Sequence, residues 1–181
     1  MTMEHIMLDL ETLGVSAGCS IVSIGAVFFN PNTKTLGEEF YAVVNRQSCK
    51  DQGLVEDDGT RQWWATQPAE IAKTLVEAEA GYSLVTALGM FCGFTAKGGE
   101  HVKLWGNGSA FDNAILASAF KACGLQTPWK FYNDRCYRTI KAIYGKHLPI
   151  RRHYGAHHNA LNDAKNQAAN LLEFTIVPAL A

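Results

Sequence analysis

Near its N-terminus the sequence predicts a strand with acidic side chains on one face and aliphatic side chains on the other. Residues 6–12 read Ile-Met-Leu-Asp-Leu-Glu-Thr, and successive side chains of a strand point to opposite faces of a sheet. Asp9 and Glu11 therefore share a face, roughly 7 Å apart. Two carboxylates at that spacing can ligate a shared metal ion, but otherwise they repel each other. An ordinary polar strand end would show the same short pattern, so its meaning depends on the rest of the chain.

Length and composition limit the alternatives. The chain has 181 residues, of which 48% are hydrophobic and 18% charged, which predicts one domain spanning 1–181. A net charge of −1 excludes a uniformly basic surface, so any nucleic-acid binding must use a local patch. We expect no signal peptide and no membrane span, because no apolar stretch reaches roughly 18 residues. Five widely spaced cysteines without a CxxC pair predict free thiols and a cytoplasmic location.

The hydrophobic pattern predicts an antiparallel meander followed by helices and crossover strands. The first three strands are predicted at 4–10, 20–29 and 36–44, with a turn at 30–32 and a polar loop at 47–59. Helices are predicted at 60–65, 68–73, 82–95, 110–122, 134–144 and 159–175, and further strands at 102–105 and 130–133. Asp134 is predicted to cap the fifth helix. This order predicts an α/β fold with a mixed β-sheet, antiparallel and then parallel, flanked by helices.

A second acidic segment follows the strand predicted at 102–105. Asp112 comes just after the break Gly106-Asn107-Gly108, at the start of a helix. An acid in a first turn often serves only to offset the helix dipole. However, the ends of strands are where α/β folds place their sites. Asp112 is therefore a candidate metal ligand.

The third motif lies at the start of the last predicted helix: His158 precedes this helix and Asp163 lies near its beginning. His158 and Asp163 are five residues apart, which on one helix would separate them by about 140° around the axis. We therefore expect His158 on the preceding loop and Asp163 in the first helical turn. The neighbouring His157 is the rival for a base role, with His158 favoured by its spacing to Asp163. A zinc site is disfavoured because no cysteine lies at ligand spacing.

Together these segments resemble the DEDDh (DnaQ-like) 3′–5′ exonuclease family over nearly the whole chain. The motifs are Asp-x-Glu-Thr at 9–12, Asn-x-x-x-Phe-Asp at 107–112 and His-x-Ala-x-x-Asp at 158–163. The resemblance is nearest to small single-domain bacterial and phage exoribonucleases, to which the segments 62–64 and 134–139 are also similar. The element order suits the ribonuclease-H-like fold of that family.

The resemblance implies a two-metal mechanism. Asp9, Glu11, Asp112 and Asp163 would hold two Mg²⁺ or Mn²⁺ ions, and His158 would be the general base that activates water. Oxygen ligands favour these hard cations, two metals can stabilise the attacking and leaving oxygens, and imidazole titrates near neutral pH.

The resemblance also implies a substrate groove and an assembly. Thr12 and Leu13 would meet the terminal nucleotide, and Asn107 and Phe111 would line the groove, although Phe111 suits the core equally. Related small enzymes are often homodimers, so a homodimer is implied as well.

We therefore predict an exonuclease that hydrolyses the 3′-terminal phosphodiester of nucleic acid, RNA favoured, and releases nucleoside 5′-monophosphates. DNA as substrate, a proofreading role, or a non-catalytic nucleic-acid-binding protein on the same fold stay open. A basic stretch is a candidate phosphate contact as well as a solvated face. It comprises Lys141, Lys146, His147, Arg151, Arg152 and His153. Trp63 and Trp64 suit packing or a dimer contact better than base stacking.

Overall fold

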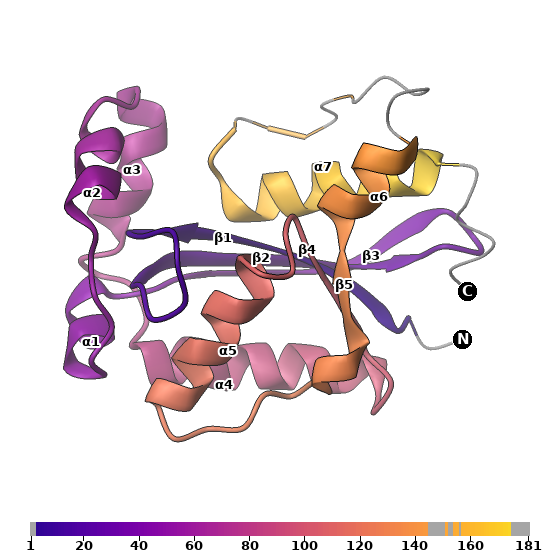
Figure 1. The fold of residues 1–181 in the computed structure, drawn as a ribbon, viewed down its shortest axis with the longest axis horizontal. Coiled ribbons are helices and arrows are strands. Elements are labelled where there is room, and N and C mark those ends of the chain that lie inside the picture. Colours follow the sequence, from indigo (N-terminus) through magenta and orange to yellow (C-terminus); the bar gives the residue numbers. More distant parts are fainter. Residues whose placement is uncertain (1–2, 145–150, 152–153, 156, 175–181) are drawn as a thin grey trace.

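Five strands form one mixed sheet in the order β3-β2-β1-β4-β5, shown in Figure 1. The computed structural model describes residues 3–144, 151, 154–155 and 157–174. The strands are β1 (His5–Thr12), β2 (Ile21–Asn30), β3 (Thr35–Val43), β4 (Lys103–Gly106) and β5 (Asp134–Cys136). β1, β2 and β3 pair in antiparallel fashion, while β4 and β5 add in parallel beyond β1. The predicted meander and mixed sheet are confirmed.

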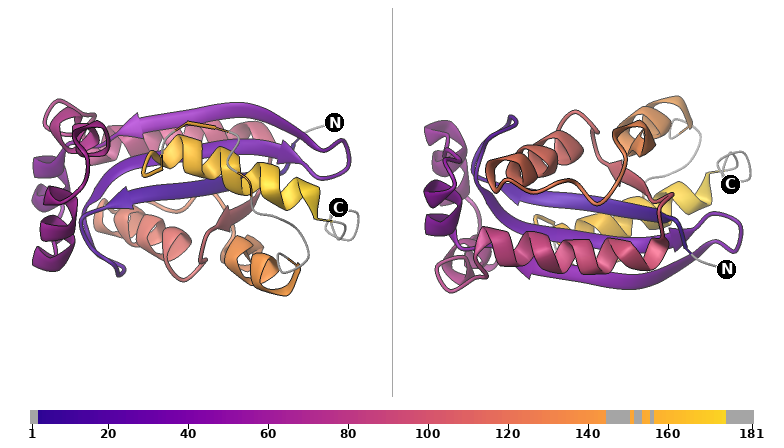
Figure 2. Two further views of the ribbon diagram at one scale, coloured as in Figure 1. Left: turned by 90° about the horizontal axis from the view of Figure 1, so that it is seen from above. Right: turned by 90° about the horizontal axis from the view of Figure 1, so that it is seen from below.

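Helices cover both faces of the sheet and one of its ends. They are α1 (Arg46–Asp51), α2 (Asp58–Ala65), α3 (Ala69–Glu77), α4 (Leu84–Thr95), α5 (Asp112–Ala122), α6 (Tyr137–Tyr144) and α7 (Ala160–Glu173), with short turns η1 (Ala96–Gly98) and η2 (Phe131–Asn133). Figure 2 shows α7 across one face and α4 across the other, and Figure 1 shows α1, α2 and α3 grouped beyond the C-terminal end of β1. None of the described helices has the length and apolar character that a membrane crossing needs.

The two faces of β1 enter different hydrophobic cores. Ile6, Leu8 and Leu10 belong to the larger core, which is closed by α4 and α5. Met7 belongs to a second core with the apolar residues of α7. Because side chains alternate along a strand, Asp9 faces the α7 side together with Met7. The predicted separation of acidic and aliphatic faces is confirmed.

A glycine lets α7 approach the sheet closely. Gly25 of β2 pairs with Asp9 across the β1–β2 ladder. A Cβ atom on Gly25 would lie 2.1 Å from the carbonyl carbon of Ala160, so any side chain there would push α7 away. The first turn of α7, which carries Asp163, is thereby brought to the strand that carries Asp9.

The predicted structure of residues 130–144 is wrong in two respects. Residues 130–133, predicted as a strand, contain η2, and the strand β5 follows it and pairs with β4. Asp134 does not cap α6, which begins at Tyr137. Instead its Oδ1 accepts hydrogen bonds from Asn113 Nδ2 at 2.7 Å and Trp129 Nε1 at 2.9 Å. Tertiary partners decide the role of Asp134, and its local sequence does not contain them.

Other boundaries differ by less. The predicted loop 47–59 contains most of α1 and the first two residues of α2. The α1 cap Asn45 accepts a hydrogen bond from the Ser48 amide. α3 continues to Glu77, beyond the predicted end at residue 73. Most of residues 145–157, between the last two predicted helices, and the last predicted helical residue, 175, lie outside the described residues.

A buried histidine links β1 to β4. Trp105 Nε1 donates a hydrogen bond of 3.0 Å to Nδ1 of His5, and His5 is only 4% exposed. Burial, assisted by the nearby charges of Lys103 and Arg135, lowers the pKa of His5 to about 4. The folded protein therefore holds this ring neutral, with Nδ1 as an acceptor.

We expect this histidine to make the protein less stable in mild acid. The unfolded state binds more protons between pH 6.5 and about 4, so stability present above pH 6.5 is lost as the pH falls. The loss should reach about 2 kcal/mol at pH 5 relative to pH 7. His5→Asn offers Trp105 an acceptor that does not titrate, so urea unfolding at the two pH values should lack this component. An unchanged pH dependence in the variant would contradict the prediction.

Candidate active site

Three carboxylates converge where β1 meets the start of α7. Asp9, Glu11 and Asp163 each offer one oxygen, and these atoms lie within 4.8 Å of one another. β1 supplies the first two from one face, and α7 supplies the third from its first turn. Asn159 fixes the start of that turn, because its side chain accepts a hydrogen bond of 3.0 Å from the Asn162 amide. This group of oxygens could hold a metal ion.

Asp112 is the fourth acid and lies beside this group at the start of α5. Its Oδ1 accepts a hydrogen bond of 3.3 Å from the backbone amide of Leu10, which lies between Asp9 and Glu11 in the chain. Asp112 is 2% exposed, and its Oδ2 has no hydrogen-bond partner among the described residues. A buried carboxylate oxygen without a partner is costly, which fits a ligand atom for a cation.

The electrostatics of the four acids favour a bound cation. Burial, followed by repulsion from Asp112, Glu11 and Asp163, raises the pKa of Asp9 well above its ordinary value. Burial, followed by repulsion from Asp163 and Asp112, raises the pKa of Glu11 to about 8. Burial raises the pKa of Asp112 to about 7, against the opposing effects of the Leu10 amide and Arg138. These shifts describe carboxylates that resist ionisation together unless positive charge is supplied.

Two adjacent histidines contact Asp163 in different ways. His158 donates its backbone N–H to Oδ2 of Asp163 at 2.9 Å. His157 places Nδ1 3.4 Å from Oδ1 of the same carboxylate, and its side chain is 72% exposed. The φ of His158 is 58°, a left-handed conformation uncommon for residues with a side chain. As predicted, His158 lies just before the helix and Asp163 lies in its first turn.

Three of the acids, Asp9, Glu11 and Asp163, line a cavity of about 830 Å³, whereas the buried Asp112 is not part of its lining. Thr12, Asn107 and Phe111 line it, as do both histidines. Leu13 is not part of the lining: it is 1% exposed and packs with Val22, Trp64 and Ala78. Two residues further along the chain, Val15 lines the cavity in its place, and its side chain is 74% exposed. The chain turns after β1, and this turn, rather than strand alternation, sets which of the two residues reaches the cavity.

Sequence reasoning missed Gln167, which contacts Asp9 directly. Its Nε2 donates a hydrogen bond of 2.6 Å to Oδ1 of Asp9, and the residue is 8% exposed. Gln167 follows Asp163 by one helical turn, so both face the cavity. An amide at that spacing from the acid was the signal available in the sequence. The hydrogen bond orients the Asp9 carboxylate and opposes the rise in its pKa.

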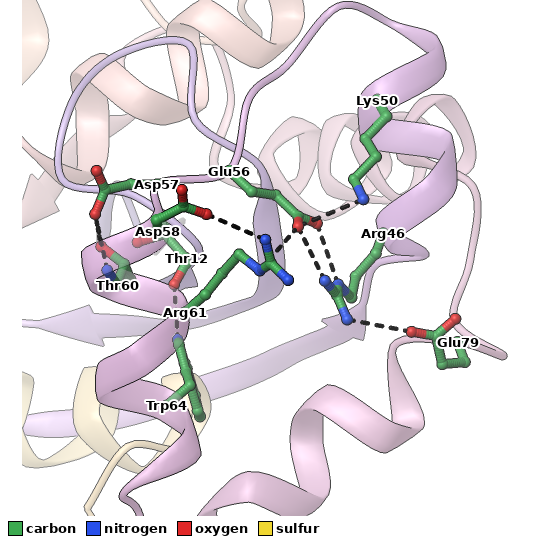
Figure 3. A network of polar contacts seen from close by, with 10 residues as sticks. All are labelled: Thr12, Arg46, Lys50, Glu56, Asp57, Asp58, Thr60, Arg61, Trp64 and Glu79. Carbon is green, nitrogen blue, oxygen red and sulfur yellow. Dashed lines mark hydrogen bonds and ion pairs between the residues drawn. The ribbon is translucent and has the colours of Figure 1, made fainter.

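A polar network centred on Glu56 joins α1 to α2, as Figure 3 shows. The side chain of Glu56 is only 7% exposed. Its carboxylate pairs with Arg46 at 2.9 Å, Lys50 at 3.4 Å and Arg61 at 3.7 Å. Nearby, Trp64 Nε1 donates a hydrogen bond of 2.9 Å to the carbonyl of Thr12. α2 is thus attached to the end of β1, as Figure 3 makes visible.

This attachment positions Trp63, the neighbour of Trp64. Trp63 is 41% exposed and lines the cavity. Its ring centroid lies 4.9 Å from that of His158, edge to face. The structure therefore gives the two tryptophans different surroundings: Trp64 packs in the core, as favoured from the sequence, while Trp63 faces the cavity.

Two asparagines of α7 hold the segment that precedes His158. Asn170 accepts from the backbone N–H of Arg151 at 2.9 Å and donates to its carbonyl at 2.8 Å. Asn166 makes the same pair of bonds with Tyr154, at 3.0 and 2.8 Å. Each side-chain amide thus satisfies both backbone groups of one residue, as a neighbouring strand would. The helix that carries Asp163 therefore also anchors the backbones of Arg151 and Tyr154, which precede His158 in the chain.

The fold is similar to that of solved nucleases. "Cell-death related nuclease 4 (CRN-4)" matches with a TM-score of 0.64 and 14% identity over 97% of this chain and 64% of that chain. The nuclease domain of 3′hExo, described as a DEDDh family member bound to rAMP, gives 0.62 and 13% over 97% of this chain and 92% of that one. E. coli exonuclease I in complex with a dT13 oligonucleotide gives 0.67 and 14% over 97% and 42%. The chain thus spans less than two thirds of CRN-4 and of exonuclease I, and the likeness shows a shared ribonuclease-H-like fold.

No curated protein sequence matches the chain. A family model does match it, over residues 4–175, and its description is "3′-5′ exoribonuclease Rv2179c-like domain". That match includes the acidic residues of β1, α5 and α7 and the histidine before α7. The chain belongs to the Rv2179c-like 3′–5′ exoribonuclease domain family.

Proposed function

We propose that this protein is a Mg²⁺- or Mn²⁺-dependent 3′–5′ exonuclease that shortens RNA and releases nucleoside 5′-monophosphates. The observation that carries the proposal is the convergence of Asp9, Glu11 and Asp163 within 4.8 Å, with Asp112 buried beside them. Four carboxylates grouped in this way, three of them with raised pKa values, form a site for hard divalent cations. An all-oxygen donor set does not favour zinc.

Asp9, Glu11, Asp112 and Asp163 would hold the cations, two per site. Bound there, the cations would neutralise the carboxylates and stabilise the charge on the attacking and leaving oxygens of a phosphodiester. Gln167 orients Asp9 for this task through its 2.6 Å hydrogen bond, and the Leu10 amide orients Asp112. Ligand atoms held in this way lose little freedom when they coordinate.

His158 is the proposed general base. It lines the cavity beside Asp163, where its imidazole can take the proton from the attacking water. Trp63 packs against the ring edge to face and limits its rotation. His157 lines the same cavity, but its ring contacts the Asp163 carboxylate, which places it in competition with a cation for that oxygen.

RNA is favoured over DNA because the family description names an exoribonuclease. Thr12 lies next to Glu11 at the cavity edge, where a terminal ribose would lie against backbone and hydroxyl groups that can contact a 2′-hydroxyl. A DNA exonuclease is the second candidate, since one solved relative holds a dT13 oligonucleotide.

The test uses 5′-labelled RNA and DNA oligomers of one sequence, single-stranded and with 3′ overhangs, incubated with Mn²⁺ or Mg²⁺. The wild type should shorten RNA stepwise from the 3′ end, and His158→Ala should slow the reaction about 10²- to 10⁴-fold. Metal binding, measured by calorimetry, should persist in His158→Ala. His157→Ala is the matched control and should stay within about 10-fold of the wild type.

Three outcomes would contradict parts of the proposal. Faster cleavage of DNA than RNA would assign the second candidate. Equal losses in both histidine variants would remove the specific role of His158. Metal binding without shortening of any oligomer would leave a nucleic-acid-binding protein rather than an enzyme.

A further inference from the structure

The cavity that holds the acids has two chemically different ends. One end lies against α2 and is formed by Trp63, Val15 and Asp57. The other lies against α6, and there Lys141 and Arg151 join the lining. Figure 1 shows α2 and α6 on opposite sides of the N-terminal end of α7. The acids therefore lie between an aromatic end and a cationic end.

The two cations at the second end have no ion-pair partner among the described carboxylates. Lys141 and Arg151 are both exposed, whereas Lys103 pairs with Glu4 at 3.3 Å and Lys165 with Glu39 at 2.6 Å. Lys141 and Arg151 line the same cavity as the acids but do not pair with them. Their two positive charges are therefore available to an anion that enters the cavity.

Arg151 is held in place by its backbone rather than by its side chain. Asn170 fixes its N–H at 2.9 Å and its carbonyl at 2.8 Å. The guanidinium is thus displayed from an anchored main chain. Lys141 is displayed from α6, a helix that packs on α7. Both cations therefore project from elements attached to the helix that carries Asp163.

A nucleic-acid strand must place its scissile phosphodiester at the acids, with its terminal nucleoside on one side and the rest of the strand on the other. The terminal nucleoside carries a base and no further phosphate, which suits the aromatic end near Trp63. The remaining strand carries the next phosphodiester, which suits the cationic end.

We propose that Lys141 and Arg151 form a subsite for the phosphodiester immediately 5′ to the one that is cleaved. The strand then enters over α6, and its 3′-terminal nucleoside faces α2. This inference rests on the proposed exonuclease function and adds the direction of the strand and a minimum substrate of three nucleotides for full binding.

The test compares two substrates of the complete protein. One is a single-stranded RNA oligomer, and the other is the p-nitrophenyl ester of uridine 5′-monophosphate, which has no upstream phosphate. The double variant Lys141→Gln/Arg151→Gln should raise KM for the oligomer roughly 10-fold or more, with kcat and turnover of the ester unchanged. The salt dependence of kcat/KM for the oligomer should become shallower by about 0.7 in the log–log slope.

The matched control removes two positive charges elsewhere. Lys121→Gln/Lys130→Gln changes exposed lysines outside the cavity lining and should leave all these values unchanged. It separates a local contact from a change in net charge.

A neutral linkage in the substrate identifies which phosphate is bound. A methylphosphonate immediately 5′ to the scissile linkage should weaken the wild type about as much as the double variant does. In the double variant the same methylphosphonate should cause no further loss, because both changes remove one interaction. A methylphosphonate three linkages further upstream should act equally on both proteins.

If the methylphosphonate weakened binding to the double variant as much as to the wild type, so that the two losses added, the proposed subsite would be wrong. Slower turnover of the ester by the double variant would contradict it as well. These results differ from failure of the proposed function, in which the wild type would cleave neither the ester nor the oligomer, and the subsite would fall with it.

Discussion

Replacing Asp9 by Asn should abolish RNA cleavage and, in the presence of a chelator, should make the protein more stable than the wild type. Asn preserves the shape of the side chain and the acceptor for Gln167, which bonds Oδ1 of Asp9 at 2.6 Å. It removes an acid whose ionised form is disfavoured in the folded protein, because burial and three other acids raise the pKa of Asp9. We expect activity to fall because a proposed cation ligand is lost, and stability to rise because the unfavourable ionisation of Asp9 in the fold is removed.

The two effects are measured separately. Single-turnover cleavage of end-labelled RNA should slow by about 10⁴-fold or more, at or beyond the upper end of what loss of a general base produces. Thermal unfolding in EDTA at pH 8 should show a higher Tm than for the wild type. Asp51→Asn, which changes an exposed acid on α1, is the control and should alter neither value. A variant that cleaves normally, or that is less stable in EDTA, would contradict the assignment.

Removing divalent cations should make stability fall as the pH rises from about 5 to 8. The pKa of Glu11 is about 8 in the folded protein against an ordinary value of 4.5. Between these values the folded state binds more protons than the unfolded state, so the free energy of unfolding decreases with increasing pH. Glu11 alone should account for about 3 kcal/mol over this range, and Asp9 and Asp112 act in the same direction.

Cation binding should reverse this dependence. Urea unfolding across the pH range, in EDTA and in millimolar Mn²⁺, should show the two curves separating as the pH rises, because the cation replaces the protons as the source of positive charge. Parallel curves in EDTA and Mn²⁺ would show that the acids do not bind the metal.

These effects depend on how the acids are supported, and Gln167 shows that the support is tertiary. Gln167 and Asp9 are 158 positions apart in the chain. They meet because Gly25 admits the first turn of α7 against β2. The spacing of Gln167 from Asp163 indicates only that both lie on one face of α7, and the contact with Asp9 depends on how α7 packs on the sheet.

The sequence by itself determined the elements whose residues alternate or repeat regularly. The strand at Asp9 and Glu11, the antiparallel meander and the helices after residue 82 follow from local periodicity. The prediction that acids far apart in the chain form one site came from the order of the three motifs along the sequence, and no geometric argument supported it. These features are encoded locally, because each residue's side of a strand or helix depends only on its neighbours in the chain.

Tertiary structure alone decided the remaining features. β5 is a strand only because β4 offers it an edge, and Asp134 bonds Asn113 and Trp129 rather than an adjacent helix. Leu13 is buried while Val15 reaches the cavity, because the turn after β1 ends the alternation. Asn170 binds the backbone of Arg151 across 19 positions. In each case a hydrogen bond or a packing contact joins residues that the sequence keeps apart, and long-range contacts of this kind are set only when the whole chain has folded.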